Sequence, residues 1–67
     1  MITLNINGEP HPFASPLSIE QLLARLELAD RRVAVEKNGA IVPKSQHGQV
    51  LAQDGDALEI VVAVGGG

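Results

Sequence analysis

The spacing of apolar and polar residues near the N-terminus predicts a hairpin. Every second residue from Ile2 to Ile6 is apolar, which is the period of a half-buried strand. The dipeptide Asn7-Gly8 follows and is typical of a tight turn, because both central residues of a type I′ turn need positive φ. Pro10 and Pro12 then limit the returning strand to a short piece at a sheet edge, since proline cannot donate a ladder hydrogen bond.

A helix is predicted over about Ser18–Leu28. Ser18 is a good N-cap residue, and Gln21 stands three positions later, where it completes a capping box. The apolar residues that follow recur with the i, i+3, i+4, i+7 spacing of one helical face: Ile19, Leu22, Leu23 and Leu26. Beyond them, Arg31-Arg32 lies where positive charge favours the negative end of a helix.

The middle of the chain predicts a second hairpin. Val33–Lys37 has the composition of a strand, Asn38-Gly39 predicts another tight turn, and Ala40–Val42 returns as a short strand that Pro43 ends. The next residues, Lys44–Gly48, predict a loop or a single helical turn.

The final strand is predicted over Ala57–Val64, after a tight turn at Asp54-Gly55-Asp56. Glu59 is its one polar residue, so the strand is apolar on both faces and belongs in the centre of a sheet. Its neighbours are then the first and third strands, with the helix on one face. Two hairpins, one crossover helix and a central last strand predict an α+β fold of the β-grasp type, with a mixed sheet of four to five strands.

Composition and charge exclude several classes of function and of site. The 67 residues make one small domain, expected over residues 1–64, with a flexible tail over residues 65–67. There is no cysteine, which excludes disulfides, a thiolate nucleophile, a persulfide on the chain and cysteine metal ligands. The net charge of −3 suits a basic partner and argues against nucleic-acid binding. The first residues lack a basic region followed by a long apolar run, and no apolar run is long enough for a membrane. We therefore expect no signal peptide and a soluble cytoplasmic protein.

No residue pattern predicts a catalytic centre. His11 and His47 are far apart in the sequence and are interpreted as solvated loop residues, and the carboxylates lack metal-ligand spacing. The serines have no evident histidine and carboxylate partners. The chain is therefore expected not to be an enzyme and to bind neither a metal nor a cofactor of its own.

The candidate site is the glycine run at the C-terminus. Glycine has no Cβ, so Gly65, Gly66 and Gly67 could enter a channel too narrow for side chains, with the carboxylate of Gly67 at the end. Taken alone, the run could equally be a disordered end, a truncation or a remnant of cloning. If the helix covers the Leu58 face of the last strand, Val61 and Ala63 lie on the other face, either as a partner-binding surface or as ordinary strand packing.

Three segments resemble the ThiS sulfur-carrier proteins of thiamin biosynthesis: Val33–Pro43, Gln53–Ile60 and Val64–Gly67. The predicted helix falls where that family has its helix, so the resemblance spans nearly the whole chain. Two positions depart from the pattern. Lys44 stands where arginine is common, and His47 falls near a position that is often aromatic. These two departures leave the details of partner contact in question, and neither lies within the glycine run at the C-terminus.

The resemblance implies a ubiquitin-like β-grasp fold and a specific chemistry. A ThiF-type adenylyltransferase would adenylylate the carboxylate of Gly67 with ATP and Mg²⁺, which bind that enzyme and not this chain. Sulfur, often from a cysteine desulfurase, would then convert the adenylate to a thiocarboxylate, and thiazole synthase (ThiG) would consume it. Gly65, Gly66 and Gly67, with Val61 and Ala63, would contact these partners.

Two alternatives remain open at this point. One is a MoaD-like small subunit of molybdopterin synthase, which shares the fold, the diglycine end and the activation chemistry. The other is a non-covalent ubiquitin-like binding module that uses the apolar sheet face and has an idle tail.

Overall fold

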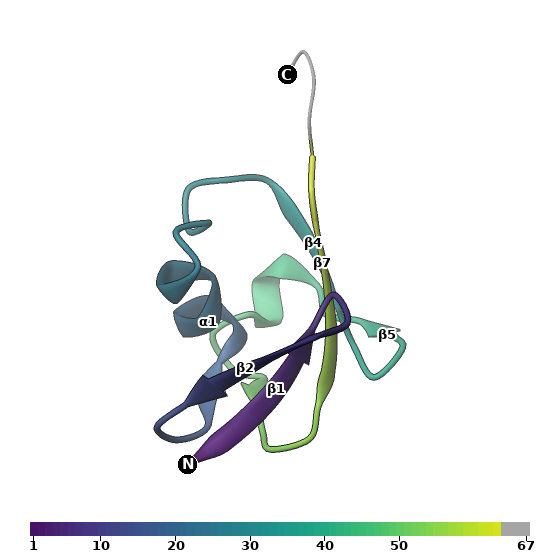
Figure 1. Ribbon diagram of the computed structural model, residues 1–67. Coiled ribbons are helices and arrows are strands. Elements are labelled where there is room, and N and C mark those ends of the chain that lie inside the picture. Colours follow the sequence, from purple (N-terminus) through teal and green to yellow (C-terminus); the bar gives the residue numbers. More distant parts are fainter. Residues whose placement is uncertain (64–67) are drawn as a thin grey trace.

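Five strands form one mixed sheet, and the helix α1 packs on one of its faces (Figure 1). The computed structural model describes residues 1–63. Within the sheet the strand order is β2-β1-β7-β4-β5, with β1 and β7 parallel and the other neighbours antiparallel. The elements in chain order are β1 (Ile2–Ile6), β2 (Glu9–Phe13), β3 (Leu17–Ser18), α1 (Ile19–Arg25), β4 (Val33–Lys37), β5 (Ala40–Ile41), the 3₁₀ turn η1 (Lys44–Gln46), β6 (Leu51–Ala52) and β7 (Ala57–Val62).

Both predicted hairpins are confirmed, and both turn at an Asn-Gly pair. Asn7 and Gly8 have φ of 52° and 85°, and Asn38 and Gly39 have φ of 51° and 87°. These left-handed conformations suit glycine and asparagine far better than other residues. β2, which contains the two prolines, lies at one edge of the sheet as predicted, and β5 lies at the other.

The start of the helix is confirmed and its predicted end is wrong. The predicted helix covered Ser18–Leu28, whereas α1 spans Ile19–Arg25. Glu27 adopts a φ of 61°, and the Leu28 amide donates back to the Leu23 carbonyl at 2.8 Å, which closes the helix with a Schellman-type cap. Glycine or asparagine commonly marks such an end, and this chain has glutamate there, so the sequence carried no stop signal.

The predicted position of the last strand is confirmed. β7 lies between β1 and β4, with Leu58 opposite Ile6 of β1 and Ile60 opposite Val35 of β4. Its core-facing residues join those of β1, β4 and α1 in a single aliphatic core: Ile2, Leu4, Ile6, Leu17, Ile19, Leu22, Leu23, Val35, Val42, Ala52, Leu58 and Ile60. A mixed five-stranded sheet with one helix and a central last strand is the β-grasp fold.

A second, two-stranded sheet was not predicted. β3 pairs antiparallel with β6 on the helix side of the molecule, with Leu17 opposite Ala52. Strands of two residues carry no measurable hydrophobic period, so nothing in the sequence marks them. The pair closes the core below the start of α1, because Leu17 and Ala52 are both buried.

Two predictions concern the end of the chain. The predicted last residue of the final strand, Val64, and the predicted boundary between a 1–64 domain and a 65–67 tail lie outside the described residues. No helix within residues 1–63 is long and apolar enough to cross a membrane.

Candidate functional site

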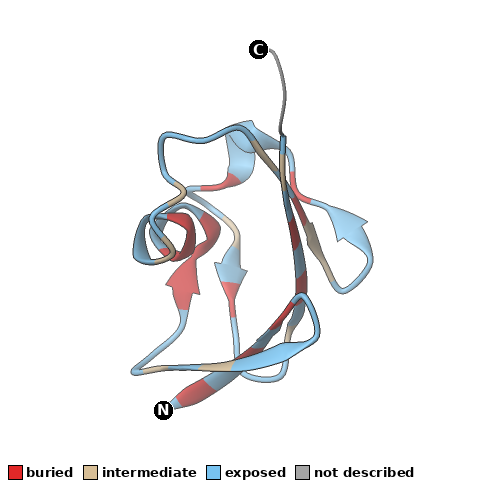
Figure 2. Cartoon of the chain, turned by 45° about the horizontal axis from the view of Figure 1, so that its top comes forward, coloured by how far each residue is buried: buried red, intermediate tan, exposed pale blue. Residues whose placement is uncertain are grey.

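The side of β7 that faces away from the helix is exposed, which the sequence had left open. Leu58 and Ile60 are buried, whereas the alternate residues Glu59, Val61 and Ala63 are exposed, and Val61 keeps 63% of its surface accessible. Figure 2 shows this alternation along the central strand. Val61 is therefore an apolar side chain on an open face.

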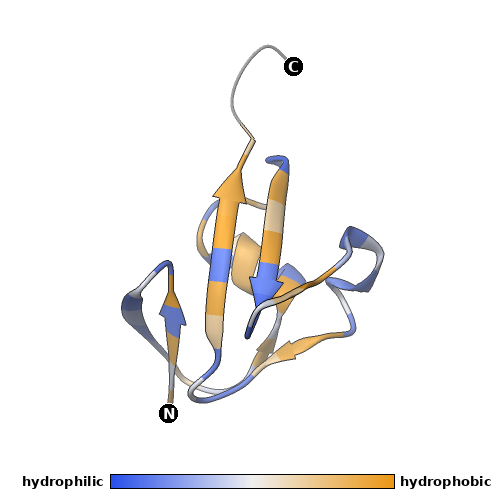
Figure 3. Ribbon diagram, turned by 90° about the vertical axis from the view of Figure 1, so that its right-hand side faces the viewer, coloured by the Kyte–Doolittle hydropathy of each residue, from blue (hydrophilic) through white to orange (hydrophobic). Residues whose placement is uncertain are grey.

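The open face continues onto the neighbouring strands. Ala34 of β4 lies directly opposite Val61, and Glu36 lies directly opposite Glu59. Ile41 of β5, which is 74% exposed, lies opposite Glu36 on the other side. Figure 3 looks onto this side, where β7 and β4 run next to each other in front of α1 and are mostly hydrophobic, with hydrophilic segments between. We call the following residues together the open face: Ala34, Glu36, Ile41, Glu59, Val61 and Ala63.

Ala34, Glu36 and Ile41 were not predicted as part of a site. The alternation along β4 could have indicated the first two, because Val35 between them is one of the most buried side chains. Ile41 could be placed only by its strand register, which depends on tertiary pairing.

Side-chain amides hold β7 from both flanking hairpin turns. The amide of Asn7 accepts from the Ile60 N–H at 2.8 Å and donates to the Ile60 carbonyl at 3.1 Å. The Asn38 amide oxygen accepts from the Ala57 N–H at 2.9 Å. Each asparagine therefore serves both as a left-handed turn residue and as a substitute ladder partner for the central strand.

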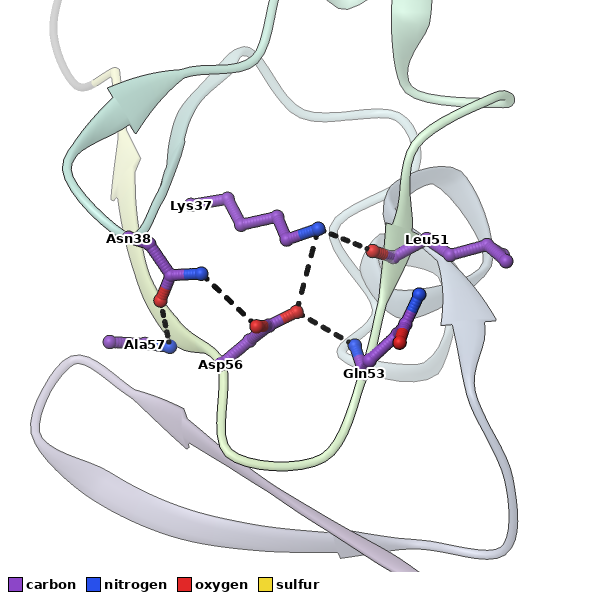
Figure 4. Close-up of polar contacts among 6 residues, drawn as sticks. All are labelled: Lys37, Asn38, Leu51, Gln53, Asp56 and Ala57. Carbon is purple, nitrogen blue, oxygen red and sulfur yellow. Dashed lines mark hydrogen bonds and ion pairs between the residues drawn. The ribbon is translucent and has the colours of Figure 1, made fainter.

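Hydrogen bonds to the Asp56 carboxylate hold the start of β7 in place (Figure 4). Asp56 accepts from the Gln53 N–H at 2.8 Å and from the Asn38 amide at 3.1 Å, and Lys37 Nζ lies 3.6 Å from its Oδ2. Lys37 also donates to the Leu51 carbonyl at 2.9 Å. Burial alone raises the pKa of Asp56, but these hydrogen bonds and the lysine charge outweigh it and hold the pKa below its usual value.

The other end of β7 leads to the predicted tail. The Ala63 N–H donates to the Arg32 carbonyl at 2.8 Å, which is the last contact of this strand that the structure describes. Gly65, Gly66 and Gly67, the predicted reactive tail, lie outside the described residues. Four residues separate Ala63 from the end of the printed sequence, and four residues reach at most about 14 Å when fully extended.

A basic pocket of about 190 Å³ lies on the helix side of the sheet, near the end of β7. Three of its lining residues are cations and one is an acid: it is lined by Glu20, Leu23, Ala29, Arg31, Arg32, Val33, Lys44 and His47. Val33 of this lining pairs with Val62. The surroundings of the strand end are therefore basic on the helix side, whereas the open face carries glutamates.

The expectation that both histidines are solvated loop residues is wrong. His47 is 7% exposed, and its Nε2 lies 3.0 Å from the Val42 carbonyl oxygen, so this nitrogen carries the proton and donates. His47 follows η1, which folds it back beside a buried part of the chain. His11 lies within β2 and is half-buried. Within residues 1–63, no group of three or more His, Asp or Glu side chains is placed to hold a metal ion.

Comparisons with known proteins agree with the resemblance found in the sequence. A family model described as the ThiS family matches residues 4–67. The chain is 42% identical over 65 residues to the sulfur carrier protein ThiS of Bacillus subtilis, an alignment that covers 96% of this chain and 98% of that protein. It is 52% identical over 64 residues to a thiazole synthase of Paramagnetospirillum magneticum, covering 96% of this chain.

That thiazole synthase is a much longer protein, and this chain spans 20% of its length. Among solved structures, the crystal structure of the thiamine biosynthesis protein (ThiS) from Geobacter metallireducens superposes with a TM-score of 0.84 at 33% identity, covering 98% of this chain and all of that one. The similarity therefore extends over the sheet, the helix and the open face.

Proposed function

This chain belongs to the ThiS family, and on that premise we propose that it is a sulfur carrier for thiamin biosynthesis. The carboxylate of Gly67 carries the sulfur as a thiocarboxylate. The chain acts as a protein co-substrate, and the enzymes that load and unload it supply the catalytic groups.

The observation that carries this proposal is the short reach from the sheet to Gly67. Because at most about 14 Å of chain separates Ala63 from Gly67, an enzyme that acts on the carboxylate must lie against the end of β7. The apolar residues Val61 and Ala63 are exposed there, on the side of the sheet that faces away from the helix. Such a surface suits a protein partner that shields a reaction centre from water.

The chemistry follows from the groups that the sequence offers. A C-terminal carboxylate has a pKa of about 3.5 and is ionised at neutral pH, so it can attack the α-phosphorus of ATP and release pyrophosphate. Sulfur at the oxidation level of sulfide then attacks the acyl carbonyl and displaces AMP, which leaves the thiocarboxylate. If the donor is a persulfide, the attack gives an acyl disulfide, and a thiol must reduce its S–S bond to release the thiocarboxylate. The chain has no cysteine, so sulfur has no thiol on this protein to bind to. Glycine leaves the reacting carbonyl open to attack, and Gly65 and Gly66 allow a narrow approach.

The partners follow from this cycle. A ThiF-type adenylyltransferase binds ATP and Mg²⁺ and forms the adenylate, a cysteine desulfurase or another donor supplies sulfur, and thiazole synthase (ThiG) accepts it. The similarity to one fifth of a protein named thiazole synthase supports this last partner.

Intact mass measurement tests the proposal. After incubation with a ThiF-type adenylyltransferase, ATP and Mg²⁺, we expect an adenylate on Gly67, and with a sulfur donor an oxygen-for-sulfur mass change. A chain that lacks Gly67 is the matched control and should fold normally but remain unmodified. The mass of the protein from its natural host should also correspond to a chain that ends at Gly67.

Two results would contradict the proposal. A wild-type chain that never forms an adenylate would be a non-covalent binding module and not a carrier. A thiocarboxylate that transfers only to the large subunit of molybdopterin synthase, and never to thiazole synthase, would place the chain in a different pathway.

A further inference from the structure

The open face contains a pair of glutamates that the fold itself does not neutralise. Glu36 of β4 and Glu59 of β7 lie directly opposite each other on the side away from the helix. Side chains opposite each other on antiparallel strands have Cβ atoms about 5 Å apart, and like charges in this position destabilise the sheet. A chain that breaks a local rule of this kind often does so at a functional surface.

Within residues 1–63, the structure records no ion pair to either glutamate. The nearest lysine in the sequence, Lys37, is engaged elsewhere: its Nζ contacts the Leu51 carbonyl and the Asp56 carboxylate. Its strand partner is the buried Leu58, so Lys37 lies on the helix-facing register of β4.

The glutamates sit between apolar neighbours. Ile41 lies on one side of Glu36, and the Ala34–Val61 pair forms the next row toward the end of β7. Glu59 precedes Ala63 by four residues, which is about 13 Å along a strand. A standard protein interface covers about 800 Å² of each partner, equivalent to a disc of about 16 Å radius. An enzyme seated around Ala63 therefore covers Glu59 as well.

Covering two carboxylates without a counter-charge is unfavourable, because each loses its water. The partner must then supply a cation at this point. A guanidinium group fits best, since its planar fork offers five donors and can bond two carboxylates at once.

We propose that the Glu36–Glu59 pair is the receptor for an arginine side chain of the activating adenylyltransferase, with Ile41 and Val61 packing on either side of it. This proposal rests on the proposed carrier function. It adds the chemistry by which the enzyme recognises the carrier.

The test is the steady-state rate of adenylylation by the ThiF-type adenylyltransferase, measured against carrier concentration at low and high salt. For the E36Q/E59Q double variant we expect the KM for the carrier to rise about tenfold or more. The kcat should be unchanged, and the salt dependence of KM should become weaker. Because the repulsion between the glutamates is removed, this variant should also unfold at an equal or higher urea concentration than wild type.

The matched control is E9Q/E27Q, which changes the net charge by the same amount. Glu9 lies opposite the core residue Ile6 and Glu27 is exposed at the end of α1, so both lie on the helix side, away from the open face. This control should keep the wild-type KM.

Each other outcome has a distinct meaning. If wild type is adenylylated and E36Q/E59Q keeps its KM, this inference is overturned and the carrier function stands. If E36Q/E59Q keeps its KM but self-associates in light scattering, the glutamates only keep copies of the chain apart, and the inference is again overturned. If wild type is not adenylylated at all, the carrier function fails and this inference fails with it.

Discussion

Replacing Asp56 by asparagine should loosen the start of β7 and should do so less in acid than at neutral pH. The Asp56 carboxylate receives the Gln53 N–H, the Asn38 amide and the Lys37 ammonium group, and the Asp56 side chain is 16% exposed. An asparagine has one acceptor oxygen, and its NH₂ group would face a donor. Hydrogen bonds to a charged group contribute about 1.5–3 kcal/mol, so we expect the variant to lose about 2 kcal/mol of unfolding free energy at neutral pH.

The pH dependence follows from the direction of the pKa shift. The pKa of Asp56 is raised by burial but lowered more by its hydrogen bonds and by Lys37, so it lies below its usual value in the folded state. A carboxylate with a depressed folded pKa contributes stability above its unfolded pKa of about 3.9. That contribution is lost as the pH falls through the folded pKa. The difference between wild type and Asp56→Asn should therefore shrink as the pH falls below the unfolded pKa of about 3.9.

Urea denaturation at neutral and acidic pH measures both effects. Asp30→Asn, in the exposed connection after α1, is the control and should leave the unfolding free energy within about 0.5 kcal/mol of wild type. A destabilisation by Asp56→Asn that stays the same at both pH values would refute the electrostatic explanation. No destabilisation at all would show that the network does not hold β7.

Three further substitutions test the strand, the helix end and the open face. Asn7→Gly keeps the turn geometry but removes both hydrogen bonds to Ile60, so urea denaturation should show a loss of about 1–3 kcal/mol; an unchanged midpoint would contradict this role. Glu27→Gly should raise the thermal midpoint, with a gain of about 1 kcal/mol, because φ of 61° is strained for glutamate; the opposite sign would refute that reading. Val61→Glu, at an exposed position, should change stability by less than about 1 kcal/mol yet weaken adenylyltransferase binding in calorimetry, whereas the reverse pattern would mean that the face is not a docking surface.

Only some residues of the candidate site could be predicted from the sequence. Parity could place Val61 and Ala63 on the side of the last strand opposite Leu58, since alternate residues of a strand point to opposite sides. Whether that side is exposed was left open by the sequence and decided by the structure. Glu59 was seen only as an exception in an apolar strand. Its partner Glu36 became visible once β4 and β7 were paired in register, because that pairing joins residues 23 positions apart in the chain.

The predictions for the histidines and for the end of the helix were wrong for related reasons. His47 was assigned to solvent because polar residues in loops usually are, but η1 turns it inward, where the Val42 carbonyl accepts a hydrogen bond from its Nε2. Glu27 carries no recognised stop signal, and the backbone turns there because Leu28 can pack against the core. Both outcomes depend on neighbours that lie outside any local window of sequence.

The amino-acid sequence by itself determined the local elements of this protein: alternating strands, two Asn-Gly turns, a capped helix and a glycine run without a competing cysteine. Those features follow from backbone geometry and from the period of the hydrophobic pattern, which a few adjacent residues express. Only the tertiary structure decided that the two turn asparagines clamp β7, that Asp56 anchors its start, and that Glu36 meets Glu59 beside Val61. These depend on long-range register, because a sheet brings side chains together across strands whose order in space differs from their order in the chain.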